Sequence, residues 1–396
     1  MMQISPETQL FIREHSSDDV RVLALQAKKY PDIDMPTAIT QIAGRKVAAE
    51  KIPSWWEIEK IWYPKHLSLE QCSSEITARY KARLLQGDSL TDLTGGFGID
   101  CSFLATGFKS ATYVERQEEL CEIAAHNFPV LNLNHINIKN EDGVTYLQVM
   151  SPVDCLFLDP ARRNEHGGKT VAISDCEPNV AELEELLLQK ANRVMIKLSP
   201  MLDLSLALKE LKQTQEVHIL SVNNECKELL ILLGQTSPAE ISIHCVNLFT
   251  KGTQKEQHFV FTREQEQCSE CTYTDSLETY LYEPNASLLK AGAFRSIAAA
   301  YPVRKLHPNS HLYTSDTFIE NFPGRIFRIV NQCSFNKKEV KENLADLKKA
   351  NVTVRTSPAT VAELRKRIHL AEGGDTYLFA STLNNGQKVL IRCEKV

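Results

Sequence analysis

The 396-residue chain has no apolar run long enough to cross a membrane. A transmembrane helix needs about 20 consecutive apolar residues, and residues 229–233 are typical of the longest runs here. The N-terminal MMQISPETQ lacks the basic start and the apolar core of a secretory signal. The eleven cysteines are an odd number scattered through apolar segments, which indicates reduced thiols. We therefore expect a cytoplasmic protein without a membrane segment.

The chain also has no overall excess of basic residues, since its formal net charge is −5. The charge is unevenly distributed, however. Residues 325–396 contain 14 Lys and Arg against 7 Asp and Glu, a net charge of +7 that leaves −12 for the rest of the chain. A basic segment on an acidic body suggests contact with a polyanion such as nucleic acid. The alternative is a solvated surface whose charges are uneven by chance.

Hydrophobic periodicity predicts a helical region over 1–85 and a doubly wound α/β region after it. From Ser89, short apolar strands alternate with amphipathic helices, which predicts a parallel sheet covered on both faces. The expected parallel strands are 89–93, 111–115, 135–138, 153–158, 192–198 and 217–222. The stretches 228–233 and 241–249 are expected to be antiparallel edge strands, because too little chain separates them for crossover helices.

Two small α+β units are expected to follow a polar boundary near 263–276. The first has a helix expected from Asn285 to about residue 300. In the second, Asn336 and Ser357 are expected to cap helices, with Pro358 in a first helical position. The expected domain boundaries are 1–85, 86–272, 273–321 and 322–396.

A glycine-rich turn follows the first expected strand, in DLTGGFGID at residues 92–100. Gly95, Gly96 and Gly98 allow a tight turn and a close approach to a ligand, and the next helix begins with free N–H groups. The third glycine of the G-x-G-x-x-G hydride-cofactor fingerprint is missing. Asp92 precedes the turn instead, which favours a ligand with a cationic amino-acid end over a pyrophosphate.

Two further acids stand at or after the ends of neighbouring strands. Glu115 lies 19 residues beyond Gly96, where an acid can bind ribose hydroxyls. Asp142 comes after the third expected strand, from which it could reach an adenine amine. The fourth strand ends in CLFLDPARR, residues 155–163, so that a buried apolar run presents Asp159 at its tip.

In this order, the motifs resemble those of class I S-adenosylmethionine-dependent methyltransferases, over about residues 70–235. The alternative is another doubly wound fold that binds a nucleotide. The resemblance implies a Rossmann-like α/β fold and S-adenosylmethionine as the cofactor. It also implies a set of cofactor-binding residues, namely Asp92, Thr94, Gly95, Gly96, Gly98, Glu115 and Asp142.

Three other stretches resemble bacterial methyltransferases that carry a small ferredoxin-like domain and a C-terminal THUMP-like domain. These are LEQCSSEITARYKARLL, YLYEPNASLLKAG and the β-α-β-α-β-β pattern of the tail. Because THUMP domains of other families bind RNA, the resemblance implies an RNA substrate, tRNA or rRNA, by analogy at the level of the fold. It says nothing of the oligomeric state.

The resemblance also places Asp159 and Pro160 beside the transferable methyl group. The Asp159 oxygen would accept a hydrogen bond from the N–H of the target nitrogen. Ala161 and Arg162 depart from the family pattern, which has a second proline and an aromatic residue to stack on a flipped base. Arg162 and Arg163 are expected to bind substrate phosphates or, alternatively, to pair with nearby acids such as Glu165.

The DPAR motif also occurs in uracil-5-methyltransferases, which attack the base with a cysteine that follows the fifth strand. That strand ends here in MIKLSP, residues 195–200, without a cysteine, so methylation of a nitrogen is the better interpretation. Lys197 in this segment is expected either to contact the substrate or to pair with Asp159.

No metal site is predicted. Cys268 and Cys271 form a lone CxxC, and only His244, Cys245 and His258 lie upstream, at irregular spacing. In the tail, a basic run ends an expected helix, where cations favour the helix dipole in any case. These residues, Arg365, Lys366 and Arg367, are also candidates for RNA contact.

The sequence thus predicts a cytoplasmic methyltransferase that uses S-adenosylmethionine to modify a base nitrogen in RNA. One alternative is a methyltransferase for a small molecule or a protein, with the tail as an assembly module. Another is a non-catalytic RNA-binding protein with a degenerate fold, against which the intact Asp159 and glycine turn argue.

Overall fold

A computed structural model describes residues 4–162, 172–356 and 359–396. The chain divides into two compact units. The first consists of Met1–Gln215 and Leu230–Pro238, and the second of Glu216–Leu229 and Ala239–Val396. Among the helices of the described ranges, none combines the length and the apolar character that crossing a membrane requires. All eleven cysteines are free thiols.

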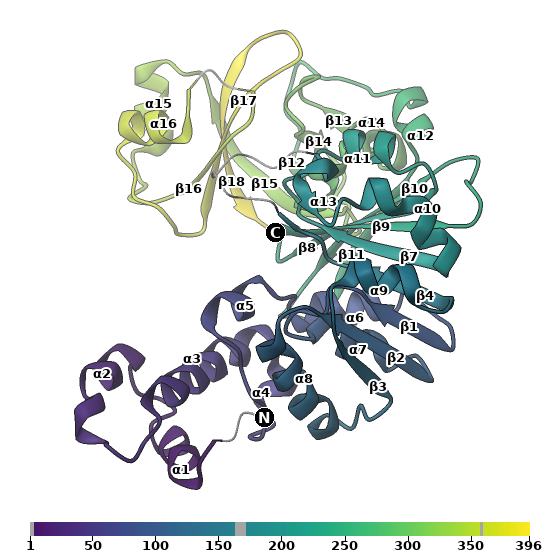
Figure 1. The fold of residues 1–396 in the computed structure, drawn as a ribbon. Coiled ribbons are helices and arrows are strands. Elements are labelled where there is room, and N and C mark those ends of the chain that lie inside the picture. The colour runs from purple at the N-terminus through teal and green to yellow at the C-terminus, as the bar shows by residue number, and fades with distance from the viewer. Residues whose placement is uncertain (1–3, 163–171, 357–358) are drawn as a thin grey trace. The chain divides into compact units, whose positions relative to one another are not determined.

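The N-terminal region is helical, as predicted (Figure 1). Its elements are α1 (Pro6–Glu14), α2 (Val20–Leu25), η1 (Ala27–Lys29), α3 (Met35–Lys51), α4 (Pro53–Trp56), α5 (His66–Gln71) and α6 (Glu75–Ala82). Asp34 caps α3 by accepting the Thr37 N–H, as residues with short polar side chains commonly do. Trp55 is buried and meets the ring of Phe97, in the glycine turn, edge-on at 5.2 Å. The helical region therefore supports the turn after the first strand.

The first unit contains five of the six predicted parallel strands, in the order β7-β4-β1-β2-β3, and β9 lies next to β7. Its strands are β1 (Ser89–Asp92), β2 (Ser110–Glu115), β3 (Ile136–Asn140), β4 (Val153–Leu158), β7 (Ala191–Leu198) and β9 (Glu225–Gly234), the last shared with the second unit. The β4–β7, β1–β4, β1–β2 and β2–β3 pairs are parallel. Because parallel strands of one sheet end at the same edge, the residues that follow them meet there.

Helices connect these strands and pack on the sheet (Figure 1). They are α7 (Ile99–Ala105), α8 (Glu118–Val130), α9 (Gly143–Val149), α10 (Val180–Lys190) and α11 (Leu204–Glu210). Helices α7 and α8 contact β2, and α10 contacts β7. A short ribbon pairs β5 (Ala161–Arg162) with β6 (Cys176–Glu177), and η2 (Ile173–Asp175) precedes β6.

The prediction of two antiparallel edge strands after the parallel sheet is wrong in part. In the second unit the strand order is β11-β10-β8-β9, with β8 (Thr214–Val222), β10 (Ser242–Leu248) and β11 (Glu256–Phe261). Strand β9 is an interior strand, and β10 pairs parallel to β8. A two-residue turn with positive φ at Asn223 and Asn224 reverses the chain into β9. Because β9 itself carries the chain back, β10 can run parallel to β8 without a crossover helix.

The remaining strands of the second unit form a seven-stranded sheet, in the order β13-β14-β12-β15-β18-β17-β16. They are β12 (Tyr280–Pro284), β13 (Arg304–Lys305), β14 (Tyr313–Ser315), β15 (Gly324–Cys333), β16 (Asn351–Val354), β17 (Thr376–Thr382) and β18 (Lys388–Lys395). The pairing of β12 with β15 makes one continuous sheet on both sides of residue 322. Leu281, Phe327 and Phe379 share a single buried cluster beneath it.

The helices of this unit differ in detail from the predicted ones. They are α12 (Arg263–Cys268), α13 (Ala286–Ala291), α14 (Arg295–Ala300), α15 (Lys337–Leu344) and α16 (Val361–Ile368). The single helix expected from Asn285 is divided after Gly292, which adopts a φ of +78°. The N-cap role of Asn336 is confirmed. Ser357 and Pro358 lie outside the described residues, and Thr360 caps α16 instead.

Candidate active site

The glycine turn lies between β1 and α7 and depends on three glycines. Gly96 and Gly98 have φ angles of +54° and +84°, which side chains with a Cβ rarely adopt. At Gly95, a Cβ atom would come within 2.3 Å of the Tyr113 ring. The hydroxyl of Tyr113 donates to the Gly96 carbonyl oxygen, which holds the turn onto β2. The turn therefore requires glycine for backbone conformation at two positions and for packing at the third.

Asp92 ends β1 directly beneath this turn and is only 1% exposed. Its Oδ1 accepts the Thr94 N–H at 3.0 Å, whereas Oδ2 has no hydrogen-bond partner among the described residues. Burial raises the pKa of Asp92 to about 8, and the charges of Asp100 and Asp159 act in the same direction. A buried carboxyl oxygen without a partner is uncommon in proteins, and a cationic ligand group would supply one.

Glu115 ends β2 and touches the same turn. Its Oε2 accepts the Gly96 N–H at 2.9 Å, and its Oε1 accepts the Gln117 N–H at 2.8 Å. These bonds fix the carboxylate at the rim of the turn, and each oxygen keeps a further acceptor position. Such an arrangement is suitable for accepting two hydroxyl groups.

Asp142 is exposed and caps α9, since its Oδ1 accepts the N–H groups of Val144 and Thr145 at 3.0 Å each. The next residue, Gly143, packs so closely on Leu93, the residue after β1, that a Cβ there would lie 2.1 Å from its carbonyl oxygen. The loop after β3 is therefore held against the start of the glycine turn.

Asp159 follows β4, the strand on the other side of β1. Its N–H donates to Oγ1 of Thr94 at 2.6 Å, so Thr94 links the ends of β1 and β4. Its carboxylate Oδ2 lies 2.5 Å from Nζ of Lys197, at the end of β7. The pairing that the sequence offered as one alternative for Lys197 is thus present. Burial raises the pKa of Asp159 against the opposing effect of Lys197, but 37% of the side chain is exposed, so we expect a carboxylate at neutral pH. Pro160 is buried.

The sequence analysis did not predict the buried ionic network that lies behind Asp159. Asp100, in the first turn of α7, lies 2.8 Å from Nζ of Lys81 and 3.1 Å from Nζ of Lys197. The hydroxyl of Ser73 donates to Asp100 at 2.7 Å. Burial alone would raise the pKa of Asp100, but the two ammonium groups hold it well below its usual range. Lys81 is fully buried on α6, and nothing in the local sequence pattern distinguishes it from a solvated helix residue.

The structure describes only some of the residues that were predicted to bind the substrate. Arg162 belongs to β5, while its side chain and all of Arg163 lie outside what the structure describes. Lys366 and Arg367 are exposed in the last turn of α16. Arg365 is half-buried and lies 3.4 Å from Glu372.

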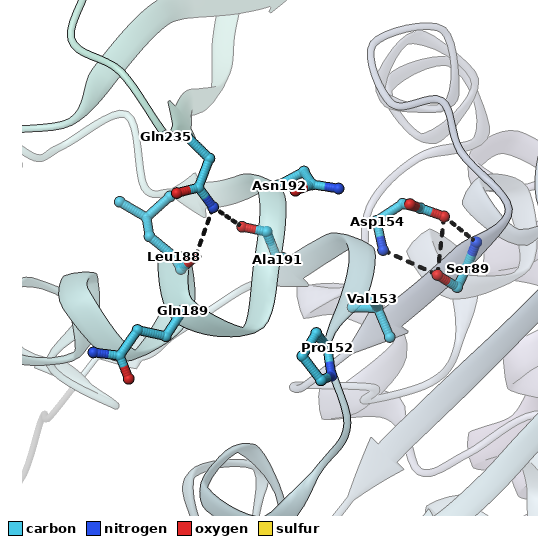
Figure 2. A pocket seen from close by; sticks show the side chains of 9 residues that line it. All are labelled: Ser89, Pro152, Val153, Asp154, Leu188, Gln189, Ala191, Asn192 and Gln235. Atoms are coloured by element: carbon cyan, nitrogen blue, oxygen red, sulfur yellow. Dashed lines mark hydrogen bonds between the residues drawn. The ribbon is translucent and has the colours of Figure 1, made fainter.

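A separate cavity of about 240 Å³ lies at the opposite, amino-terminal ends of β1, β4 and β7 (Figure 2). It is lined by Ser89, Pro152, Val153, Asp154, Leu188, Gln189, Ala191, Asn192 and Gln235. Several of its polar groups already bond to other residues of the lining. Asp154 accepts from the N–H and the hydroxyl of Ser89, and the Gln235 amide donates to the carbonyl oxygens of Leu188 and Ala191. We therefore assign the candidate active site to the carboxyl edge.

Comparisons with known proteins agree with this architecture. A family model described as a ferredoxin-like domain matches residues 280–323, and one described as THUMP domain-like matches residues 324–395. No curated protein matches the chain.

Among solved structures, a "putative methyltransferase" from Porphyromonas gingivalis W83 is 33% identical, with 100% of both chains covered and a TM-score of 0.87. An rRNA methylase from Streptococcus thermophilus is 15% identical over 40% of this chain and 93% of its own, with a TM-score of 0.29. Because the TM-score of the rRNA methylase is low, the family assignment rests on the P. gingivalis structure and on the two family models. The chain belongs to the methyltransferase family whose members carry a ferredoxin-like domain and a C-terminal THUMP-like domain.

Proposed function

We propose that the protein is an S-adenosylmethionine-dependent methyltransferase that acts on a base nitrogen in RNA. One observation supports this above all: Asp159, Asp92 and Glu115 end three neighbouring parallel strands, β4, β1 and β2, around one glycine turn. In a doubly wound sheet, this edge is where ligands bind.

The residues present fit S-adenosylmethionine. The partnerless Oδ2 of Asp92 would receive the ammonium of its amino-acid end. Glu115 would accept its ribose hydroxyls, and Asp142 would bind the adenine amine. Thr94, Gly95, Gly96 and Gly98 form the turn against which the ligand would lie. The cofactor, when bound, supplies an electrophilic methyl group on a sulfonium.

Asp159 would position the acceptor. Its carboxylate is partly exposed and held by Lys197, so it can accept the N–H of an incoming amine. That bond would aim the lone pair of the nitrogen towards the methyl group. It would also stabilise the positive charge that grows on the nitrogen as the C–N bond forms, which is electrostatic catalysis by a preorganised group. Pro160, buried behind it, would limit its movement.

An RNA substrate is supported by the THUMP-like match to residues 324–395 and by the excess of basic residues in this segment. The proposed phosphate contacts are Arg162, Arg163, Arg365, Lys366 and Arg367. A small-molecule or protein substrate is the second candidate, because the described residues of the catalytic edge include no feature specific to RNA.

The test is mass spectrometry of modified nucleosides in RNA from a strain that lacks the gene. We expect one N-methylated nucleoside to be missing. Purified protein and S-adenosylmethionine should restore it in vitro, and the Asp159→Ala variant should not. An unchanged nucleoside profile, together with methyl transfer to a small molecule or a protein, would favour the second candidate.

A further inference from the structure

Three histidines and a glutamate gather on one face of the sheet in the second unit. Glu216 and His218 are two residues apart on β8, so their side chains point to the same face. His244 on β10 is directly opposite His218 in the parallel pair. On β11, His258 is opposite Val246, which makes it the diagonal neighbour of His244.

The side chains are close enough to share a ligand. Nε2 of His218 lies 3.2 Å from Oε2 of Glu216, and the rings of His218 and His244 stack with centroids 4.3 Å apart. One ligand atom from each of Glu216, His218 and His244 lies within 4.8 Å of the other two. Nδ1 of His244 is 3.1 Å from Nε2 of His258. The group therefore concentrates nitrogen and oxygen donors at one point.

Imidazole rings lie at the centre of this group, stacked on one another. A neutral ring has a lone pair that can bind a cation. Imidazole nitrogen and carboxylate oxygen together are typical ligands of zinc and its neighbours in the first transition row.

We propose that Glu216, His218 and His244 bind a divalent transition metal ion of the zinc class, and that His258 orients His244. If His258 accepts the Nδ1–H of His244, Nε2 of His244 is available to the ion, an arrangement common around metal-binding histidines. Two His and one Glu are three protein ligands, a set that leaves a coordination position for water. Glu216 is 33% exposed, so the ion can enter from solvent.

The geometry requires only a small adjustment. Tetrahedral zinc with bonds of about 2.0–2.1 Å separates its ligand atoms by roughly 3.3 Å. The pair formed by Glu216 and His218 already has this spacing. The ligand atom of His244 lies within 4.8 Å of the other two, so it would have to move closer to them when the ion binds. Because the ligands come from β8 and β10, the bound ion would tie two neighbouring strands together and stabilise the second unit.

The lone CxxC of the sequence is the competing zinc site. Cys268 is exposed and Cys271 is half-buried, and neither belongs to the group of possible ligands found in the described residues. A test must therefore distinguish the histidine group from these cysteines. It must also use full-length protein without a histidine tag, because a tag binds the same ions.

The measurement is calorimetric titration of chelator-treated protein with Zn²⁺, repeated with Co²⁺, whose visible absorption reports coordination by the protein. We expect one equivalent to bind, and His218→Gln or His244→Gln to abolish that binding. His258→Gln should weaken it by about 10- to 100-fold, as the loss of an orienting partner commonly does. Cys268→Ser with Cys271→Ser should leave it unchanged.

Circular dichroism and thermal unfolding of metal-free samples show whether each variant folds. Glu216→Gln, at the partly exposed end of the group, provides a second variant of similar shape that should also lose affinity. The proposal is overturned if folded His218→Gln and Glu216→Gln proteins bind zinc like the parent. It is equally overturned if the parent binds none, or if only the cysteine variant loses binding.

Discussion

The ammonium of Lys197 lies 2.5 Å from the carboxylate of Asp159, across the ends of the neighbouring strands β7 and β4. The same ammonium lies 3.1 Å from Asp100, which Lys81 holds from the other side. The proposed catalytic carboxylate is thus anchored to a buried ionic network. Its orientation therefore depends on Lys197 and on the buried residues behind it.

Lys197→Gln should therefore impair methyl transfer without weakening cofactor binding. We expect kcat to fall by about 100-fold, since a misplaced catalytic group can lose that much, and Lys197→Arg to recover part of the rate. Single-turnover kinetics and calorimetry would separate the two effects. The control is Lys109→Gln, which breaks an exposed ion pair with Asp88 and should leave kcat unchanged. Equal kcat in the parent and in a folded Lys197→Gln protein would remove Lys197 from the mechanism.

Glu115→Ala should weaken S-adenosylmethionine binding. Ribose hydroxyls left without an acceptor would cost about 1–3 kcal/mol, which corresponds to a loss of affinity of roughly 5- to 150-fold. Glu115 also accepts the N–H groups of Gly96 and Gln117, so part of the loss would come from a looser turn, and Glu115→Gln should lose less. The exposed Glu118 offers a control, Glu118→Ala. An unchanged dissociation constant in folded Glu115→Ala protein would contradict the assignment.

Asp92 should make both stability and cofactor binding depend on pH. Its pKa is raised from 3.8 to about 8, so between these values the folded state binds a proton that the unfolded state has lost. Stability should therefore fall as pH rises through this window, by up to about 1.4 kcal/mol per pH unit. Asp92→Asn mimics the protonated form and should flatten this dependence, with a higher Tm than the parent at pH 8.

The same substitution should weaken cofactor binding, because the ammonium of the ligand would lose its carboxylate. In the parent, binding near neutral pH should release a proton from Asp92. Calorimetry in buffers of different ionisation enthalpy measures the number of protons released on binding. A parent protein that releases none, and an Asp92→Asn variant that binds with unchanged affinity, would together show that the ammonium lies elsewhere.

The basic tail should bind RNA through phosphates. Replacing Arg365, Lys366 and Arg367 with Gln should lower affinity across many RNA sequences and reduce the log–log salt slope by up to about 0.7 per lost contact with single strands. Cofactor affinity should not change. The variant belongs in the full-length chain, because β15 pairs with β12 and because the buried Glu283 holds Arg325 and Arg355. If affinity and slope stay at the parental values, these residues are not RNA contacts.

Much of the architecture could be predicted from sequence because local patterns report it. Apolar runs separated by amphipathic helices indicate a parallel sheet, and the glycines after β1 indicate a tight turn. The acids that are site candidates, Asp92, Glu115 and Asp159, can be recognised because each ends a strand or directly follows one. Strand periodicity did not reveal that β9 returns between other strands, since pairing partners are decided by contacts distant in sequence.

The strand ends and the acids that stand there follow from the sequence, because both depend on residues adjacent in the chain. Tertiary structure alone decided that Lys81 and Lys197 share Asp100, and that His218, His244 and His258 come together. These groups join residues that lie 14 to 97 positions apart. A buried lysine and a solvated one look alike in a sequence, and only the packing of other elements around the side chain distinguishes them.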